Sequence, residues 1–237
     1  MDFEVVFLDD GGVLNDNRRR AAEWQRLIGE FFVPRLGGTP AGWAAANLER
    51  VPPLWDEYFL PPLDGEDYRS RYDAYLGRWL EVMCEEVGLA PPHNAIELAW
   101  EATLFVTTSV RSAIPGSADA VRALADTGLA LHTASGEASW ELEGYLTAMG
   151  IREHFELLFG PDLVGHLKWS GPEYYRALLD AAGVDPAVAL VIDDDPEKAG
   201  WARQSGAAAC VVGPRGEWAD LTEAVGSLLA REPRRPR

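Results

Sequence analysis

The sequence predicts an α/β fold, namely a doubly wound parallel sheet with an all-helical domain inserted after the first strand. A short apolar run opens the chain, and from Pro115 onward further apolar runs alternate with helical patterns. Strands that alternate with amphipathic helices are typical of a parallel sheet covered by helices on both faces. By contrast, residues 17–108 contain helical stretches and no run typical of a strand.

Five apolar runs are the expected strands. The first, residues 3–8, is almost continuously apolar and rich in Val and Phe, as expected for a strand buried on both faces. Two aspartates, Asp9 and Asp10, and two glycines then end it. The other expected strands are residues 129–133, 157–159, 189–192 and 207–212.

The segments between these runs carry apolar side chains at helical spacing, which predicts helices with one buried face. The clearest begins at Pro172 and places four apolar or aromatic side chains at i, i+3, i+4 and i+7. Its members are Tyr175, Leu178, Leu179 and Ala182, and two further helices are indicated by Val121, Leu124 and Ala125 and by Leu142, Tyr145, Leu146 and Met149.

The inserted segment is expected to be a domain of its own. We expect its helical stretches to be separated by the proline pairs Pro52-Pro53, Pro61-Pro62 and Pro91-Pro92, because proline interrupts helices. Five of the nine tryptophans lie here, and we expect them to pack in its core: Trp24, Trp43, Trp55, Trp79 and Trp100. The expected divisions are residues 1–16 and 109–230 for the sheet domain, 17–108 for the helical domain and 231–237 for a disordered tail.

The charge balance argues against nucleic acid as a partner. Asp and Glu total 38 against 21 Lys and Arg, which gives a formal net charge of -17. Such a surface repels a phosphate backbone over most of its area. The basic residues in 231–237 are expected to be solvated rather than to form a binding patch.

Two cysteines, Cys84 and Cys210, lie far apart and have no Cys or His at metal-ligand spacing. We expect buried thiols in a reducing compartment. The first residues lack the basic segment of a signal peptide, and no apolar run approaches the ~20 residues of a spanning helix. A cytoplasmic protein without membrane contact is therefore expected.

Polar residues follow several of the expected strands, where the ligands of parallel sheets bind. Asp9 follows the first strand, Thr133 ends the second, Lys168 comes later, and Asp193, Asp194 and Asp195 stand at the end of the fourth. Each alone is an ordinary turn, cap or solvated residue. Together they supply a nucleophilic carboxylate, groups that can hold phosphoryl oxygens and a carboxylate pair for a hard divalent cation.

These segments resemble the motifs of the haloacid dehalogenase superfamily, most of whose members are magnesium-dependent phosphatases with an aspartyl-phosphate intermediate. The four matching segments are FLDDGGVLND (7–16), LALHTASG (129–136), KWSGPEYY (168–175) and VIDDDPEKAGWARQSG (191–206). The resemblance implies a Rossmann-like core, with residues 17–108 as a helical cap of the type inserted directly after the first motif.

The resemblance also implies roles for single residues. Asp9 becomes the nucleophile and a metal ligand, Thr133 and Ala134 contact the phosphoryl group, and Lys168 neutralises Asp9 and the phosphate. The backbone carbonyl of Gly11 and the carboxylates of Asp193 and Asp194 become the remaining Mg²⁺ ligands. The implied partner is a small phosphorylated molecule, bound by a monomer or homodimer.

One position departs from the family pattern. Phosphatases of this family usually carry a second Asp two residues after the nucleophile, which protonates the leaving group, and here Gly11 stands there. Asp10 cannot replace it, because neighbouring side chains of an extended segment point to opposite faces.

This departure leaves three functions open. The first is a phosphatase of small phosphomonoesters, which we favour. The second is a catalytically weak protein kept for binding phosphate or for regulation. The third is a 2-haloacid dehalogenase, whose relatives lack the second Asp and need no magnesium, but which leaves Asp193, Asp194 and Asp195 unexplained. A phosphomutase is disfavoured, because it needs the missing acid repeatedly.

Overall fold

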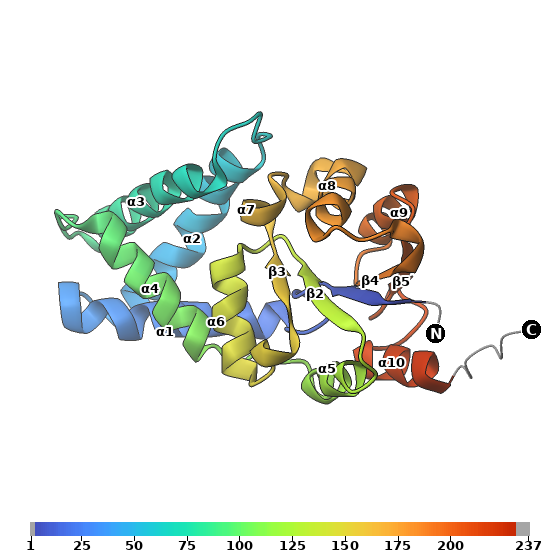
Figure 1. Cartoon of the computed structure of the whole chain (residues 1–237). Coiled ribbons are helices and arrows are strands. Elements are labelled where there is room, and N and C mark those ends of the chain that lie inside the picture. The colour runs from blue at the N-terminus through green and yellow to red at the C-terminus, as the bar shows by residue number, and fades with distance from the viewer. Residues whose placement is uncertain (1–2, 231–237) are drawn as a thin grey trace, which may run out of the picture. The chain divides into compact units, whose positions relative to one another are not determined.

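The computed structural model describes residues 3–230. The chain forms two compact units (Figure 1). One consists of the chain up to Asn17 together with the chain from Ser112 onward, and the other is Arg18–Arg111. Asp16 donates its backbone N–H to the carbonyl of Ser112 at 2.8 Å, so the first unit joins the two points where the inserted segment leaves and returns.

The first unit is built on a five-stranded sheet in the order β3-β2-β1-β4-β5, and all four strand pairs are parallel. This confirms the α/β parallel sheet predicted from the sequence. In the register, Leu8 lies opposite both Thr133 of β2 and Ile192 of β4. The strands are β1 (Val5–Leu8), β2 (Ala130–Ala134), β3 (Leu157–Phe159), β4 (Ala189–Asp193) and β5 (Ala208–Val211).

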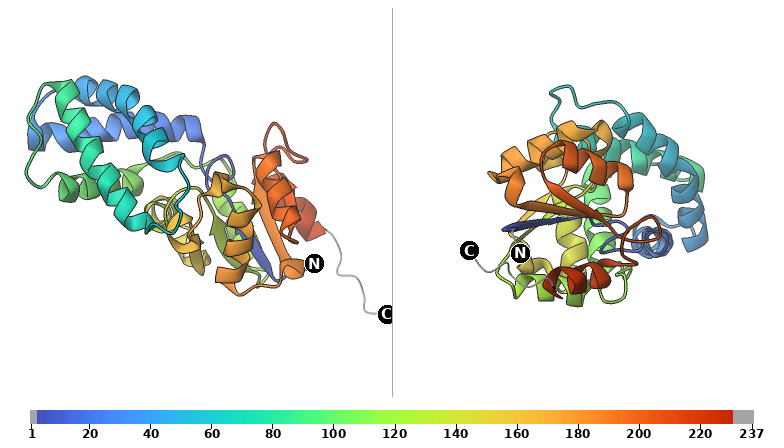
Figure 2. Two further views of the ribbon diagram at one scale, coloured as in Figure 1. Left: turned by 90° about the horizontal axis from the view of Figure 1, so that it is seen from above. Right: turned by 90° about the vertical axis from the view of Figure 1, so that its right-hand side faces the viewer.

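Helices cover both faces of this sheet (Figure 2). On one face, side chains from α5 (Ser117–Ala125), α6 (Ser139–Met149) and α10 (Leu221–Ala230) pack with alternate strand residues such as Val6 and Leu8. On the other face, α8 (Pro172–Ala182) and α9 (Pro196–Gln204) pack against Val5 and Phe7. Because β1 is buried on both faces, it lacks the alternating polar pattern of a half-exposed strand.

The remaining helical elements of this unit are short. They are η1 (Arg152–His154), α7 (Pro161–Val164), η2 (Lys168–Ser170) and η3 (Pro186–Val188). The expected tail, residues 231–237, lies outside the described residues. Among residues 3–230, no helix combines the length and the apolar character needed to cross a bilayer.

The second unit is all-helical. Its helices are α1 (Asn17–Leu36), α2 (Pro40–Phe59), α3 (Tyr68–Val87) and α4 (Ala95–Ser109). Aromatic side chains fill its interior: Phe32 lies 4.7 Å from Trp43 and 5.9 Å from Trp79 between ring centroids. Trp43 and Trp79 are buried, whereas Trp24, Trp55 and Trp100 are partly buried.

One expectation about this unit is wrong. Pro61-Pro62 and Pro91-Pro92 separate helices as expected, but Pro52-Pro53 lies inside α2. Each proline removes a backbone donor and disfavours a continuous helix. Here Leu54 and Phe59, which follow the pair, are buried in the unit, so tertiary packing of the apolar face outweighs the local preference.

Candidate active site

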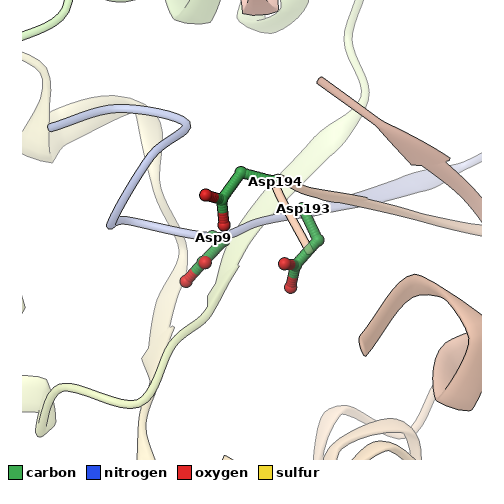
Figure 3. A group of neighbouring side chains, drawn as sticks. All are labelled: Asp9, Asp193 and Asp194. Atoms are coloured by element: carbon green, nitrogen blue, oxygen red, sulfur yellow. The ribbon is translucent and has the colours of Figure 1, made fainter. Parts of the chain in front are cut away.

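The carboxyl ends of β1 and β4 bring three aspartates together. These strands are neighbours in the sheet, and Leu8 is paired with Ile192, so Asp9 and Asp193 emerge side by side. Figure 3 shows Asp9, Asp193 and Asp194 gathered at this edge. One carboxylate oxygen from each lies within 4.8 Å of the others. Asp9 and Asp193 are buried, and Asp194 is partly exposed.

Lys168 completes this group of charges. It belongs to η2, and its Nζ lies 2.7 Å from Oδ1 of Asp9 and 2.8 Å from Oδ2 of Asp193. The side chain of Lys168 is only 2% exposed. Three carboxylates and one ammonium therefore leave a net charge of -2 when all are ionised, and such an excess in a largely buried group favours binding of a further cation.

The buried charges shift the protonation of Asp9. Burial raises the pKa of Asp9 to about 7 in the absence of metal; Lys168 opposes this shift, and Asp193 adds to it. For Lys168, burial favours the neutral amine, but the two adjacent carboxylates outweigh it and raise its pKa. The pKa of Asp194 is raised as well, first by burial and then by Asp193.

The oxygens of Asp193 and Asp9 differ in what they contact. Oδ1 of Asp193 accepts the backbone N–H of Asp195 at 2.9 Å, and Oδ2 accepts the hydroxyl of Tyr175 and forms an ion pair with Nζ of Lys168. Oδ1 of Asp9 accepts the N–H of Asp10 at 2.8 Å in addition to Lys168. Oδ2 of Asp9 and the carboxylate of Asp194 are thus the best placed to ligate a metal, with an oxygen chemistry that suits Mg²⁺.

The turn after Asp9 fits closely against Asp194. Gly12 has a φ of 79°, and a Cβ built there would overlap the Asp194 carboxylate. Gly11 precedes it and forms a bridge to Asn15. The carboxylate of Asp10 accepts from Nδ2 of Asn15 at 2.6 Å. Asp10 therefore serves to hold the turn, and the missing side chain at Gly12 leaves space for Asp194.

Thr133 and Ala134 lie at the end of β2, beside β1 and β3. Both are fully buried. The hydroxyl of Thr133 donates to the carbonyl of Phe159 at 3.1 Å. The structure therefore brings Asp9, Lys168, Asp193 and Asp194 into one group and shows the Thr133 hydroxyl engaged with the neighbouring strand.

The third aspartate of the triplet has a different task. Asp195 caps α9 by accepting the N–H of Glu197 at 2.9 Å, and its carboxylate also accepts from Lys198 at 3.1 Å. Arg215, from the loop after β5, lies 3.6 Å from the same carboxylate. These contacts explain why three consecutive aspartates are tolerated here: one binds Lys168, one faces Gly12 and one caps a helix.

Two site residues were not identified from the sequence. Tyr175 fitted the apolar face of a helix, and its hydroxyl gave no signal of a polar partner. Gly12 was taken only as part of the turn that ends a strand. A tyrosine on a buried helical face close after a motif lysine, and a second glycine after Asp9, are the features that could have indicated them.

Comparison with known proteins agrees with this geometry. A family model described as haloacid dehalogenase-like hydrolase matches residues 3–206. No curated protein matches the sequence. All the solved structures described next are under 25% identical to the chain, so their similarity shows the fold alone.

Three of these solved structures are of particular interest. A defluorinating L-2-haloacid dehalogenase has a TM-score of 0.68 and 16% identity, with 96% of both chains covered. A predicted phosphoglycolate phosphatase from Haemophilus somnus 129pt has a TM-score of 0.58 and 13% identity, covering 96% of this chain and 99% of that one. A protein described as a HAD-hydrolase, YfnB from Bacillus subtilis, has a TM-score of 0.59 and 16% identity, covering 95% and 96%.

The family model spans most of the chain, including all four motif segments identified from the sequence. The parallel sheet and the acidic group at its carboxyl edge are consistent with it. The chain belongs to the haloacid dehalogenase-like hydrolases.

Proposed function

We propose that the protein is a Mg²⁺-dependent phosphatase that cleaves a small phosphomonoester through an aspartyl-phosphate at Asp9. The observation that carries this proposal is the charge of the site: the carboxylates of Asp9, Asp193 and Asp194 lie close together, and the single ammonium of Lys168 pairs with the first two. A divalent cation would neutralise the remaining charge of -2, and carboxylate oxygens are the ligands that Mg²⁺ prefers.

Attack on a phosphate ester also requires positive charge at this site. An anionic carboxylate that approaches an anionic phosphoryl group is repelled unless nearby cations reduce the negative charge. Mg²⁺ bound by Asp9, Asp194 and the carbonyl of Gly11 would supply that charge as a Lewis acid. Lys168 is placed to supply a second positive charge at the same point.

Several residues of this chain have separate roles in the proposed reaction. Nζ of Lys168 and the N–H of Asp10 both contact Oδ1 of Asp9, and they hold the carboxylate in place for attack on phosphorus. A bond forms from Asp9 to phosphorus, and the ester bond from phosphorus to the leaving oxygen breaks. Because Gly11 offers no acid, the leaving oxygen takes its proton from water. A second water then hydrolyses the aspartyl-phosphate and regenerates Asp9.

A 2-haloacid dehalogenase is the second candidate. Two observations favour it. Gly11 stands where a phosphatase carries its acid, and a halide leaving group needs no acid. Several similar solved structures are described as L-2-haloacid dehalogenases. In such an enzyme, Asp9 would attack carbon. The carboxylate of Asp194, which lies close to Asp9 and Asp193, would have no role in that reaction, which is why we favour the phosphatase. The solved structure of YfnB is described as bound to magnesium.

A substrate screen distinguishes these candidates. The purified protein is assayed with a panel of phosphomonoesters in Mg²⁺ and in excess EDTA, and with 2-chloropropionate in both. Phosphate release that requires Mg²⁺ supports the phosphatase. Chloride release that persists in EDTA supports the dehalogenase, and tight binding of Mg²⁺ and phosphate without turnover supports a binding or regulatory protein.

A further inference from the structure

Helix α8 contributes the side chain of Tyr175 to the acidic group. The family motifs assign no role to this residue. The hydroxyl of Tyr175 donates to Oδ2 of Asp193 at 3.3 Å. The same oxygen lies 2.8 Å from Nζ of Lys168, and Oδ1 of Asp193 accepts the backbone N–H of Asp195. Two hydrogen bonds and one ion pair therefore hold the carboxylate of Asp193, and Tyr175 is the neutral side chain among these partners.

These contacts are shielded from solvent. Tyr175 and Asp193 are both 0% exposed. A phenol is un-ionised at neutral pH, so its hydroxyl is available as a donor to the carboxylate. Hydrogen bonds to a charged group are stronger in such surroundings, and water cannot easily replace a lost donor there. The Tyr175 hydroxyl thus limits how far the Asp193 carboxylate can rotate.

One short segment delivers both side chains to this oxygen. Lys168 lies in η2, the chain turns at Gly171 with a φ of 102°, and α8 begins at Pro172, one turn before Tyr175. Asp193 therefore binds both ends of residues 168–175. If Asp193 moves, the anchor that holds Lys168 against Asp9 moves with it.

We propose that Tyr175 is a positioning residue: by holding Asp193, it keeps the ammonium of Lys168 on Oδ1 of Asp9 and keeps Asp9 oriented for attack. Tyr175 does not touch the substrate in this role. The inference goes beyond the proposed function, since Lys168 pairs with Asp9 whether the carboxylate attacks phosphorus or carbon.

The neighbouring tyrosine provides a matched control. Tyr174 is also 0% exposed, but its hydroxyl donates to the backbone carbonyl of Ser135 at 2.9 Å. Tyr174→Phe and Tyr175→Phe each remove one buried hydroxyl and keep the ring. A general loss of packing or stability affects both variants, whereas a loss of Asp193 positioning affects only Tyr175→Phe.

The resting protein allows a test that needs no substrate. The chain has only two lysines, Lys168 and Lys198, so the ammonium signals of ¹⁵N-lysine-labelled protein can be assigned by Lys198→Arg. We expect Tyr175→Phe to shift the Lys168 ammonium signal and to speed its hydrogen exchange by about tenfold, the size expected for a lost hydrogen bond to a charged group. Tyr174→Phe should change the exchange rate much less, because its hydroxyl donates to Ser135 and not to Asp193.

The kinetic test asks whether Tyr175 acts through Asp193. On whichever substrate is turned over, Tyr175→Phe should lower kcat by about tenfold and leave KM within about twofold. Once Asp193→Asn is present, Tyr175→Phe should have no further effect, because the two residues act as one unit.

Two results would overturn this inference. The first is a Lys168 ammonium signal and exchange rate that do not change in Tyr175→Phe. The second is an equal loss of kcat from Tyr175→Phe with and without Asp193→Asn, which would mean that the tyrosine acts independently of Asp193. The ammonium measurement stands even if the phosphatase proposal fails, since it requires no turnover.

Discussion

Nζ of Lys168 lies 2.7 Å from Oδ1 of Asp9, and both side chains are buried. The pair is not isolated, because Asp193 shares the same ammonium. One positive charge thus serves two buried carboxylates, with a third, Asp194, close by. The predictions below follow from this imbalance and from the turn that carries Asp9.

The first prediction concerns pH and stability without metal. The ordinary pKa of an Asp is 3.8, and in the metal-free folded protein that of Asp9 is about 7. Between these values the folded state binds more protons than the unfolded state, so the free energy of unfolding falls as pH rises from about 4 to about 7. Urea unfolding in EDTA at pH 5 and pH 7.5 measures this fall.

Asp9→Asn is the control, because the amide does not titrate. It should lose much less stability than the original protein over the same pH range, and Mg²⁺ at pH 7.5 should stabilise the original protein more than the variant. An equal pH dependence in the two proteins would contradict the raised pKa of Asp9.

The second prediction concerns Asp194, which we propose as a metal ligand. Asp194→Asn removes one charged oxygen ligand and should raise the Mg²⁺ concentration for half-maximal activation by about tenfold or more. Asp195→Asn is the comparison, since that carboxylate caps α9. It should lower stability by about 1 kcal/mol at most and change the Mg²⁺ requirement little. Calorimetric titration with Mg²⁺ measures the affinity of both variants. If Asp194→Asn bound Mg²⁺ as tightly as the original protein, Asp194 would not be a ligand.

The third prediction concerns Gly12. Gly12→Ala should weaken Mg²⁺ binding sharply, because the added Cβ would displace the Asp194 carboxylate. Gly150→Ala is a matched control: Gly150 also has a positive φ, 67°, but has open space around it. Both variants should lose about 1–2 kcal/mol from backbone strain. If the two showed the same Mg²⁺ affinity, close contact between Gly12 and Asp194 would be unimportant for the metal.

The fourth prediction concerns the missing acid. Without a carboxylate at Gly11, cleavage should depend steeply on leaving-group pKa, so aryl phosphates should react much faster than alkyl phosphates. Gly12 has a positive φ and Gly11 does not. A side chain at position 11 therefore causes none of the strain that a left-handed backbone imposes. Gly11→Asp should therefore raise the rate on alkyl phosphates and flatten the dependence. Similar rates on both ester types in the original protein would point to an acid elsewhere in the site.

Much of the fold was predictable because local signals and packing agree in the sheet unit. The run at residues 157–159 is the strand β3 (Leu157–Phe159), and the helix expected from Pro172 is α8 (Pro172–Ala182). Elsewhere the ends shift by a residue or two, as for β1, which begins at Val5 rather than Phe3. The prediction that Pro52-Pro53 separates two helices was wrong, because burial of one face of α2 outweighs the tendency of proline to interrupt a helix.

The site was predictable only as a set of strand ends. Order along the chain indicated that Asp9, Lys168 and the triple aspartate would meet, and the structure brings Asp9, Lys168, Asp193 and Asp194 together while Asp195 caps α9. What each oxygen binds depends on three-dimensional geometry. Asp193, Asp194 and Asp195 are three identical residues in a row, so the sequence could not show that they have different partners. The Thr133 hydroxyl shows the same limit, since its acceptor, Phe159, belongs to another strand.

The central claim is that Asp9 is a nucleophile that takes a phosphoryl group in the presence of Mg²⁺. Trifluoroberyllate mimics that group on a carboxylate, and its binding can be followed by fluorine NMR and by the rise in melting temperature that a ligand of the folded state causes. We predict stoichiometric, Mg²⁺-dependent binding to the original protein and to Asp10→Asn, whose altered side chain contacts Asn15, and none to Asp9→Asn. Absence of binding in the original protein, or binding retained in Asp9→Asn, would contradict the account.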